Sequence, residues 1–180
     1  MATLVYEIAY ALYFILPAYA ANSAPVAFGG GRAIDAGKKL SDGKPIFGSH
    51  KTVRGFLAGL IAGTLTSVVQ SAALEYNLLP GFLLPFQFST LLGFIISLGA
   101  LIGDLIHSFV KRRFGIPEGS PLPIADQLDF VLGALFFYFI FPKSQSPSLL
   151  TIAIIFLVTL PLHLLTNFIA YELGLKKTRW

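Results

Sequence analysis

The sequence predicts an all-α integral membrane protein with five transmembrane helices, from its composition and from the distribution of its apolar residues. Of the 180 residues, 55% are hydrophobic and only 12% are charged, whereas about 25% of residues are charged in an ordinary soluble domain. This composition excludes a soluble globular enzyme, a disordered segment and a coiled-coil rod. A helix needs about 20 mostly apolar residues to cross a bilayer. Five apolar stretches approach that length: Leu4–Ala24, Gly55–Leu74, Phe86–Val110, Leu128–Phe141 and Ser148–Leu173.

We expect the five stretches to form one transmembrane domain over residues 1–180. The first begins at Leu4 without a basic flank or a small-residue cleavage site, so it is interpreted as a retained span and not as a signal peptide. The second carries no charged residue, and the third carries Asp104 in its second half. The fourth has 14 residues, which is short for a span, and is expected to extend into residues 124–127. Pro161 lies inside the fifth and is expected to kink it.

The basic residues are distributed unevenly along the chain. All but one of the 13 basic residues fall between the first and second stretches, after the third stretch, or in the C-terminal tail. Because basic residues mark the cytoplasmic side, the N-terminus is predicted to lie outside and the C-terminus in the cytoplasm. Two long cytoplasmic loops follow from this topology: loop 1, Pro25–Arg54, and loop 2, which follows the third stretch.

Several chemistries are excluded because the chain lacks the residues for them. It has no cysteine, so thiolate zinc sites, iron–sulfur clusters and cysteine nucleophiles are impossible. Nucleophile-elbow, His-Glu-x-x-His, Walker A and dinucleotide-binding motifs are absent. Ser108 has no convincing general base, which argues against an intramembrane serine hydrolase.

Loop 1 has 30 residues, and connections of that length are usually functional or disordered. Two interpretations stay open. It is either a solvated basic loop near anionic lipid headgroups, or a lid that binds a phosphorylated substrate. In the second case Gly29–Gly31 would expose backbone N–H groups to an anion, with the Arg32 guanidinium beside them.

The third stretch carries a polar helix face. Asp104, His107, Ser108 and Lys111 are spaced i, i+3, i+4 and i+7, which places them on one side of a helix. An aspartate within a span is expected to face protein or water. Interhelical hydrogen bonding is the alternative explanation for Asp104 and Ser108, and His107 is more typical of a hydrogen-bonded packing residue than of a ligand.

The fourth stretch opens with two acidic residues. Asp126 and Asp129 share one face of its first turn, where helix capping alone would explain them. Together with Asp104 they give three carboxylates near two helix ends, beside several cations. Because Mg²⁺ prefers hard oxygen ligands, we predict that Asp104, Asp126 and Asp129 hold Mg²⁺ in a metal–nucleotide site.

Two regions of the sequence resemble a known enzyme family. GDLIHSFVKRRFGIPEGSPLPIADQLD, residues 103–129, resembles the C-terminal signature of CDP-diacylglycerol synthases, in which a Ser, a Lys-Arg pair and an Asp-x-x-Asp follow one another. YAANSAPVAFGGGRAIDAG, residues 19–37, and DGKPIFGSHKTVRG, residues 42–55, are similar to the archaeal relatives, the CDP-archaeol synthases. The positions that match the signature are Ser108, Lys111, Arg112, Asp126 and Asp129.

The resemblance implies a five-span cell-membrane enzyme that uses Mg²⁺ and CTP, with its active site facing the cytoplasm and no nucleic-acid partner. The implied lipid substrate is 2,3-bis-O-geranylgeranyl-sn-glycerol 1-phosphate, and the products are CDP-unsaturated archaeol and pyrophosphate. In-line attack by the lipid phosphate needs alignment and charge neutralisation. The catalytic group would be Asp104, Lys111, Asp126 and Asp129. The expected substrate-binding residues are Asn22, Arg32, Asp35, Asp42, Lys51, Thr52, Ser108, Arg112 and Arg113.

Two other functions compete with this prediction. A CDP-alcohol phosphotransferase is disfavoured because its spaced Asp-Gly…Ala-Arg…Gly…Asp…Asp pattern is absent. A small ion-coupled transporter would suit intramembrane Asp104 and Pro161, but transporters place their sites near the midplane, and these polar groups lie toward the cytoplasmic edge.

Overall fold

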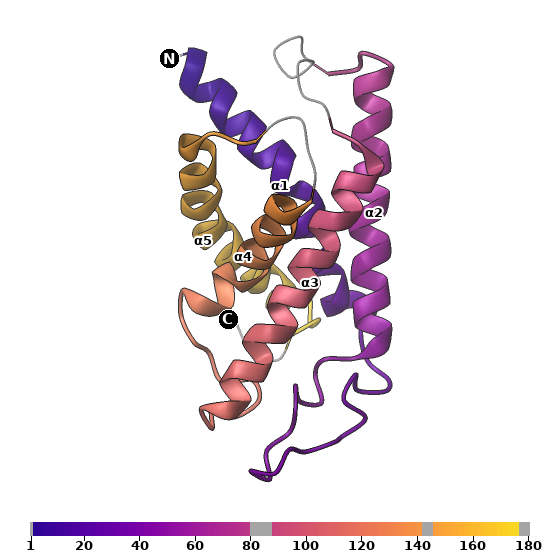
Figure 1. Ribbon diagram of the computed structural model, residues 1–180, viewed down its shortest axis with the longest axis vertical. Helices are drawn as coiled ribbons and strands as arrows, with labels where there is room; N and C mark the ends of the chain where they lie inside the picture. Colours follow the sequence, from indigo (N-terminus) through magenta and orange to yellow (C-terminus); the bar gives the residue numbers. More distant parts are fainter. Residues whose placement is uncertain (1, 80–87, 142–145, 177–180) are drawn as a thin grey trace.

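The computed structural model describes residues 2–79, 88–141 and 146–176, and these residues form five helices (Figure 1). This confirms the all-α prediction. Phe86, the predicted start of the third span, and Lys143 lie outside the described residues. The helices are α1 (Ala2–Phe28), α2 (Val53–Glu75), α3 (Thr90–Arg113), α4 (Ala125–Ile140) and α5 (Leu149–Glu172).

Two helices extend beyond their predicted ends. α1 continues four residues past Ala24, with both Pro17 and Pro25 inside the helix. α3 continues past Val110 and takes in the three basic residues Lys111–Arg113 as its last turn. Positive charges are favourable at a helix C-terminus because they face its partial negative charge. The basic run therefore extends α3 and does not begin loop 2.

Four of the five helices, α1, α2, α3 and α5, are long and apolar enough to cross a membrane. α4 has only 16 residues, in keeping with the short fourth stretch. Many large apolar side chains on the helices are exposed, among them Leu57, Val69, Phe136 and Leu157. Such a surface suits a hydrocarbon surrounding, and the fold is that of a multi-pass membrane protein.

The core lies where α1, α3, α4 and α5 meet. Phe14, Ile15, Ile96 and Phe130 are almost completely buried there. α3 and α4 form the most extensive helix pair, and their backbones nearly touch: a Cβ added to Gly103 would lie 2.9 Å from the Cα of Gly133. Only residues without a side chain permit this approach, so the glycines fix the spacing of α3 and α4.

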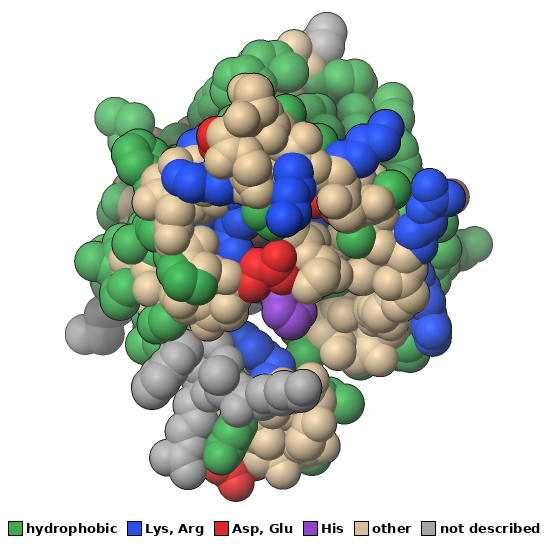
Figure 2. Space-filling model, turned by 90° about the horizontal axis from the view of Figure 1, so that it is seen from below, with side chains coloured by type: hydrophobic (Ala, Val, Ile, Leu, Met, Phe, Trp, Pro, Cys, Tyr) green, Lys and Arg blue, Asp and Glu red, His purple; other side chains and the backbone are tan. Residues whose placement is uncertain are grey.

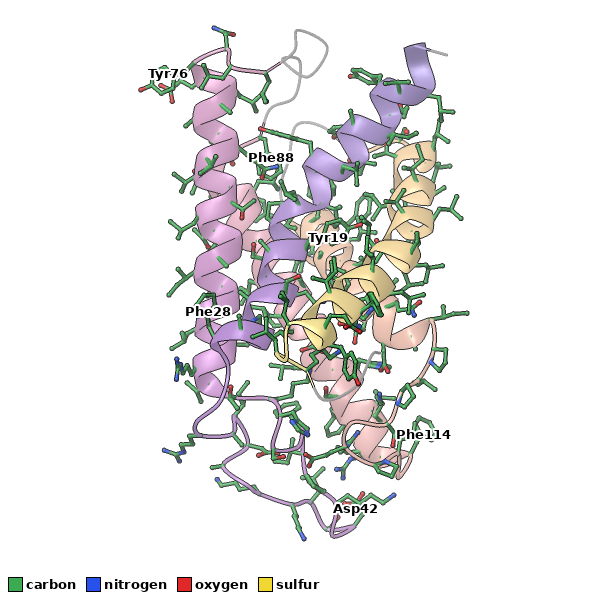
Figure 3. All side chains as sticks on the ribbon, turned by 180° about the vertical axis from the view of Figure 1, so that it is seen from behind. Tyr19, Phe28, Asp42, Tyr76, Phe88 and Phe114 are labelled. Atoms are coloured by element: carbon green, nitrogen blue, oxygen red, sulfur yellow. The ribbon has the colours of Figure 1, made fainter. Side chains whose placement is uncertain are left out.

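The two loops that the sequence singles out lie at the same end of the bundle. Loop 1 is shorter than predicted, because residues 25–28 belong to α1 and residues 53–54 to α2. The name is kept for residues 29–52, which connect α1 to α2, and loop 2 comprises residues 114–124, which connect α3 to α4. Asp42 in loop 1 and Phe114 in loop 2 both lie at the lower end of Figure 3, while Tyr76 lies at the opposite end. This end, called the loop end below, carries most of the described charged side chains.

Candidate active site

Asp104 and Asp129 meet across the seam between α3 and α4. A Cβ on Gly103 would lie only 2.5 Å from the backbone oxygen of Asp129, so the residue after Gly103 lies beside the first turns of α4. The charge of Asp104 acts on Asp129, as do the charges of His107 and Lys51. Asp104 and Asp129 are thus within electrostatic range of each other, and their joint binding of a metal ion stays a prediction.

Loop 1 contributes a cation to this pair. The ammonium of Lys51 donates to both carboxylate oxygens of Asp104, at 2.6 Å each, and both side chains are about three-quarters buried, with exposed fractions of 27% and 25%. Charge-assisted hydrogen bonds in such partly buried places are stronger than neutral ones. Lys51 thus ties the end of loop 1 to α3 and offsets the repulsion between two neighbouring carboxylates.

Asp126 faces a different set of partners. Its Oδ1 lies 2.7 Å from His107 Nε2 and accepts a 2.7 Å hydrogen bond from the Lys111 ammonium. Its Oδ2 accepts from the backbone N–H of Leu122 at 2.6 Å. His107, which the sequence favoured as a hydrogen-bonded packing residue, therefore links α3 to the first turn of α4. The i, i+3, i+7 spacing of Asp104, His107 and Lys111 does place these residues on one face, as expected.

The donor set fits a divalent cation in part. The described residues contain no group of three His, Asp or Glu side chains arranged to hold a metal ion. Asp104 and Asp129 supply hard oxygen donors of the kind Mg²⁺ prefers, with a cation already drawn to Asp104. Asp126 would have to exchange its bonds to Lys111 and Leu122 to join them.

Asp35 organises the interior of loop 1. Its carboxylate accepts hydrogen bonds from the backbone N–H groups of Gly37, Phe47 and Gly48, at 3.0, 2.9 and 3.0 Å, and only 6% of its surface is exposed. Burial alone would raise the pKa of Asp35, but the backbone donors together hold the pKa below its ordinary value. Thr52 has a comparable local partner: its hydroxyl oxygen caps α2 by accepting from Gly55 N–H.

Loop 1 is fastened to α3 and to loop 2. Asp42 accepts two hydrogen bonds from Arg113, at 2.8 and 2.7 Å, and the ammonium of Lys44 donates to the backbone oxygen of Arg113. Glu118 of loop 2 accepts from the hydroxyl and the backbone N–H of Ser49, at 2.6 and 3.0 Å. Sequence reasoning missed Lys44 and Glu118, because only the fold brings them to these partners.

The remaining predicted substrate contacts are spread more widely. Arg112 is buried, and its guanidinium donates to the backbone oxygen of Pro117. Ser108 and Asn22 are half-buried on α3 and α1. Arg32 is exposed and borders an open groove of about 500 Å³ along α2. The contacts of Asp35, Asp42, Thr52, Arg112 and Arg113 within the protein build the loops around the carboxylates, and their contact with a substrate stays a prediction.

Seen from the loop end, the molecule shows acidic and histidine side chains near the centre, with basic ones mostly above and to the right of them and a hollow beside them (Figure 2). The carboxylate pair lies at the end of an apolar bundle and is covered by a basic loop. Such a site suits the binding of water-soluble phosphates from one side and of a lipid from the other. These features define an intramembrane enzyme that acts on phosphorylated substrates.

The comparisons with known proteins identify the family. The family described as CarS-like, CDP-archaeol synthase, matches residues 3–180. A CDP-archaeol synthase of Methanococcoides burtonii is 45% identical over 175 residues, 92% of this chain and 100% of the relative. Another, of Thermococcus gammatolerans, is 44% identical over 172 residues, 95% of each chain. The chain therefore belongs to the CDP-archaeol synthase family.

A solved structure agrees with this assignment. It is described as an intramembrane enzyme for archaeal membrane lipids biosynthesis, and it is 40% identical, with a TM-score of 0.74 over 89% of this chain and 94% of that one. The predictions of the family and of the enzyme class, a CTP-dependent nucleotidyltransferase, are confirmed, and the transporter alternative is not favoured.

Proposed function

We propose that this protein transfers the CMP group of CTP to 2,3-bis-O-geranylgeranyl-sn-glycerol 1-phosphate, which gives CDP-unsaturated archaeol and pyrophosphate. The observation that carries the proposal is the meeting of Asp104 and Asp129 across the α3–α4 seam, with the Lys51 ammonium bound to Asp104. Such a constellation of fixed charges suits the transfer of a highly charged phosphoryl group.

The reaction requires little covalent chemistry from the protein. An oxygen of the lipid phosphate forms a bond to the α-phosphorus of CTP, and the bond from that phosphorus to the bridging oxygen of the β-phosphate breaks. Pyrophosphate leaves with the electron pair. Because the attacking oxygen is already anionic, no general base is needed, and the contribution of the protein is alignment and charge neutralisation.

We propose that Asp104 and Asp129 hold Mg²⁺, with Asp126 joining them when it releases Lys111. Bound Mg²⁺ would neutralise the phosphate oxygens and orient the reacting groups. Lys111 ends 2.7 Å from Asp126 Oδ1 and would then be free to donate to a phosphate. His107, bonded to the same oxygen, would keep Asp126 oriented during this exchange.

Loop 1 is proposed to bind the nucleotide. It supplies Lys51 directly to the carboxylates, and the hydrogen bonds around Asp35 give it a fixed conformation. Its attachment to Arg113 and Glu118 keeps it over the end of α3. Arg32, Asn22 and Ser108 are proposed as further substrate contacts. A fixed roof over the site would exclude water from the reacting phosphates.

The proposed placement has all five helices crossing the cell membrane, the N-terminus outside and the loop end in the cytoplasm. The location of the basic residues in loop 1 and at the end of α3 supports this orientation. CTP is soluble in the cytoplasm and the lipid is not, so a site at this interface can reach both substrates.

A direct assay tests the proposal. Purified protein in detergent is mixed with Mg²⁺, CTP labelled at the α-phosphate, and the digeranylgeranyl glycerol phosphate. We expect label in a lipid-soluble CDP product, no turnover in EDTA, and recovery when Mg²⁺ is restored. Turnover that persists in chelator would contradict the proposed role of the carboxylates, and absence of a labelled lipid would contradict the function itself. Saturated and shorter lipids would then define the substrate range.

A further inference from the structure

The inner part of α5 turns a polar face toward the active site. Thr159, His163 and Asn167 are spaced four residues apart, so they lie along one side of the helix. Thr159 and Asn167 are buried. The Thr159 hydroxyl bonds to Tyr19 of α1 at 2.8 Å. The His163 ring stacks on Phe130 of α4, with centroids 6.2 Å apart and an interplanar angle of 25°.

This contact places His163 next to the first turns of α4. Phe130 follows Asp129 directly and lies four residues after Asp126, which is one helical turn. The charges of Asp126 and Asp104 both act on His163. The inner end of α5 therefore borders the carboxylate site.

The chain then reverses after α5 and returns a lysine to the same place. Gly174, with a φ of 71°, forms the left-handed turn that commonly ends a helix. The backbone N–H groups of Leu175 and Lys176 both donate to the oxygen of Ala170, at 2.9 and 3.2 Å. After this turn the Lys176 ammonium donates to Asn167 Oδ1 at 3.0 Å, and Asn167 Nδ2 lies 3.1 Å from His163 Nδ1.

The orientation of Lys176 is the reverse of what a lysine at a membrane surface normally adopts. Such lysines extend their ammonium toward water and headgroups. Here Leu173 and Leu175 are 68% and 49% exposed, while Lys176 is half-buried. Burial lowers the pKa of Lys176, Asp126 opposes this decrease and Lys51 adds to it. Asp126 and Lys51 thus both lie within electrostatic range of this lysine.

Of the three cations at the end of α3, only Lys111 reaches the carboxylate site. Lys111 donates to Asp126 and to the backbone oxygen of Ser120. Arg112 donates to Pro117, and Arg113 holds Asp42 together with the backbone oxygens of Lys44 and Pro45. With Lys111 assigned above to one phosphate, a second phosphate that approaches from the lipid needs another cation, and on the α5 side Lys176 supplies one.

We infer that the hydrogen-bonded chain His163–Asn167–Lys176 forms the wall of the site that binds the phosphate of the lipid substrate, with Lys176 as its cation. The inference rests on the proposed function and identifies which residues serve the second substrate. Asn167 and His163 orient the ammonium, and the exposed leucines beside it adjoin the surface from which a lipid would enter. Loop 1 and Lys51 serve the nucleotide.

The test compares binding of two ligands to the full-length protein in detergent, by calorimetry and without turnover. The ligands are a dialkyl glycerol phosphate and Mg²⁺–CTP, each measured with wild type, Lys176→Met, Lys176→Arg and the control Glu75→Gln, an exposed residue at the end of α2 far from loop 1. Removing a charge-assisted contact should weaken binding of the lipid phosphate about tenfold to hundredfold. Binding of CTP should be unchanged, Lys176→Arg should restore much of the affinity, and Glu75→Gln should alter binding of neither ligand.

The corresponding uncharged dialkyl glycerol separates phosphate recognition from partition into the detergent. Wild type should prefer the phosphate over the alcohol, and Lys176→Met should lose that preference. The inference is overturned if Lys176→Met keeps the preference, or if it weakens CTP binding instead. These binding measurements require no turnover. A wild type without activity would count against the proposed function, but the effect of Lys176→Met on lipid binding could still be measured.

Discussion

Replacing Gly103 with alanine should separate α3 from α4 and displace the two carboxylates from each other. The added Cβ would lie 2.5 Å from the backbone oxygen of Asp129, and 2.9 and 3.1 Å from the Cα and N of Gly133. Carbon atoms pack at about 3.5–4.0 Å, and all three obstacles are backbone atoms that cannot rotate away. The helices must therefore part by about 1 Å.

This displacement should affect activity more than stability. Overpacking of this kind costs about 1–3 kcal/mol of folding free energy, whereas a shift of about 1 Å at a reacting centre lowers the rate about 10²-fold. We expect Gly103→Ala to remain folded, with a lower melting temperature by circular dichroism. Its kcat for formation of the CDP-lipid should fall about a hundredfold.

Gly93→Ala is the matched control on the same helix. Its Cβ would collide with the Ser67 side chain of α2, about 15 Å along α3 from Gly103 at 1.5 Å per residue. It should lower stability without a comparable loss of kcat. If folded Gly103→Ala keeps most of the wild-type kcat, the spacing of α3 and α4 does not set the geometry of the site, and the reasoning fails.

Three further predictions concern the loops. Lys51→Met leaves Asp104 without the ammonium that contacts both its oxygens and should lower the free energy of unfolding by about 1–3 kcal/mol. Added Mg²⁺ should recover part of that loss in thermal unfolding. An equal loss with and without Mg²⁺ would argue against a shared cation site. The pKa of Asp35 is lowered in the folded protein, so its ionised form should stabilise loop 1 above the unfolded pKa of about 3.9. This protection should disappear as the pH falls through the lower, folded-state pKa, which hydrogen exchange of the loop 1 amides would detect in wild type but not in Asp35→Asn. Glu118→Ala removes both bonds to Ser49 and should raise the KM for CTP more than it lowers kcat, which steady-state kinetics would reveal; a pure kcat effect would contradict a role in holding the loop.

The helices were predictable because their apolar stretches reflect the requirement that a span be about 20 apolar residues long. The polar face of α3 was equally readable, since Asp104, His107 and Lys111 follow the helical period and do lie on one side. The extension of α3 through Arg113 was not foreseen. The basic run was interpreted as loop, although the helix dipole favours such a run in a last turn.

Which carboxylates meet was not predictable from the spacing within one helix. Asp126 and Asp129 share a face of α4, but the register of α4 against α3 decides which of them lies by Asp104. That register depends on the contact between Gly103 and Gly133, which pairs residues that are 30 positions apart. Nothing in either local sequence specifies it.

The roles of the loop residues depend equally on distant contacts. Asp35 and Asp42 were expected to contact substrate, which stays a prediction. The sequence did not indicate that Asp35 accepts hydrogen bonds from backbone N–H groups of its own loop, or that Asp42 binds Arg113. The contact of Lys176 was likewise not predictable from the sequence. Gly174 is the typical signal for a helix-ending turn, but only the folded chain shows that the turn returns the lysine to Asn167.

The central claim is that Asp104 and Asp129 together hold the cation that binds CTP, and Mg²⁺-dependent CTP binding tests it most directly. Calorimetry would compare wild type with Asp129→Asn and with the control Glu75→Gln. Because Glu75 lies at the far end of α2 from loop 1, the control shows the effect of removing a negative charge away from the site. We predict that Mg²⁺ strengthens CTP binding to wild type and Glu75→Gln but not to Asp129→Asn. An Asp129→Asn protein whose CTP affinity responds to Mg²⁺ as wild type does would contradict the account.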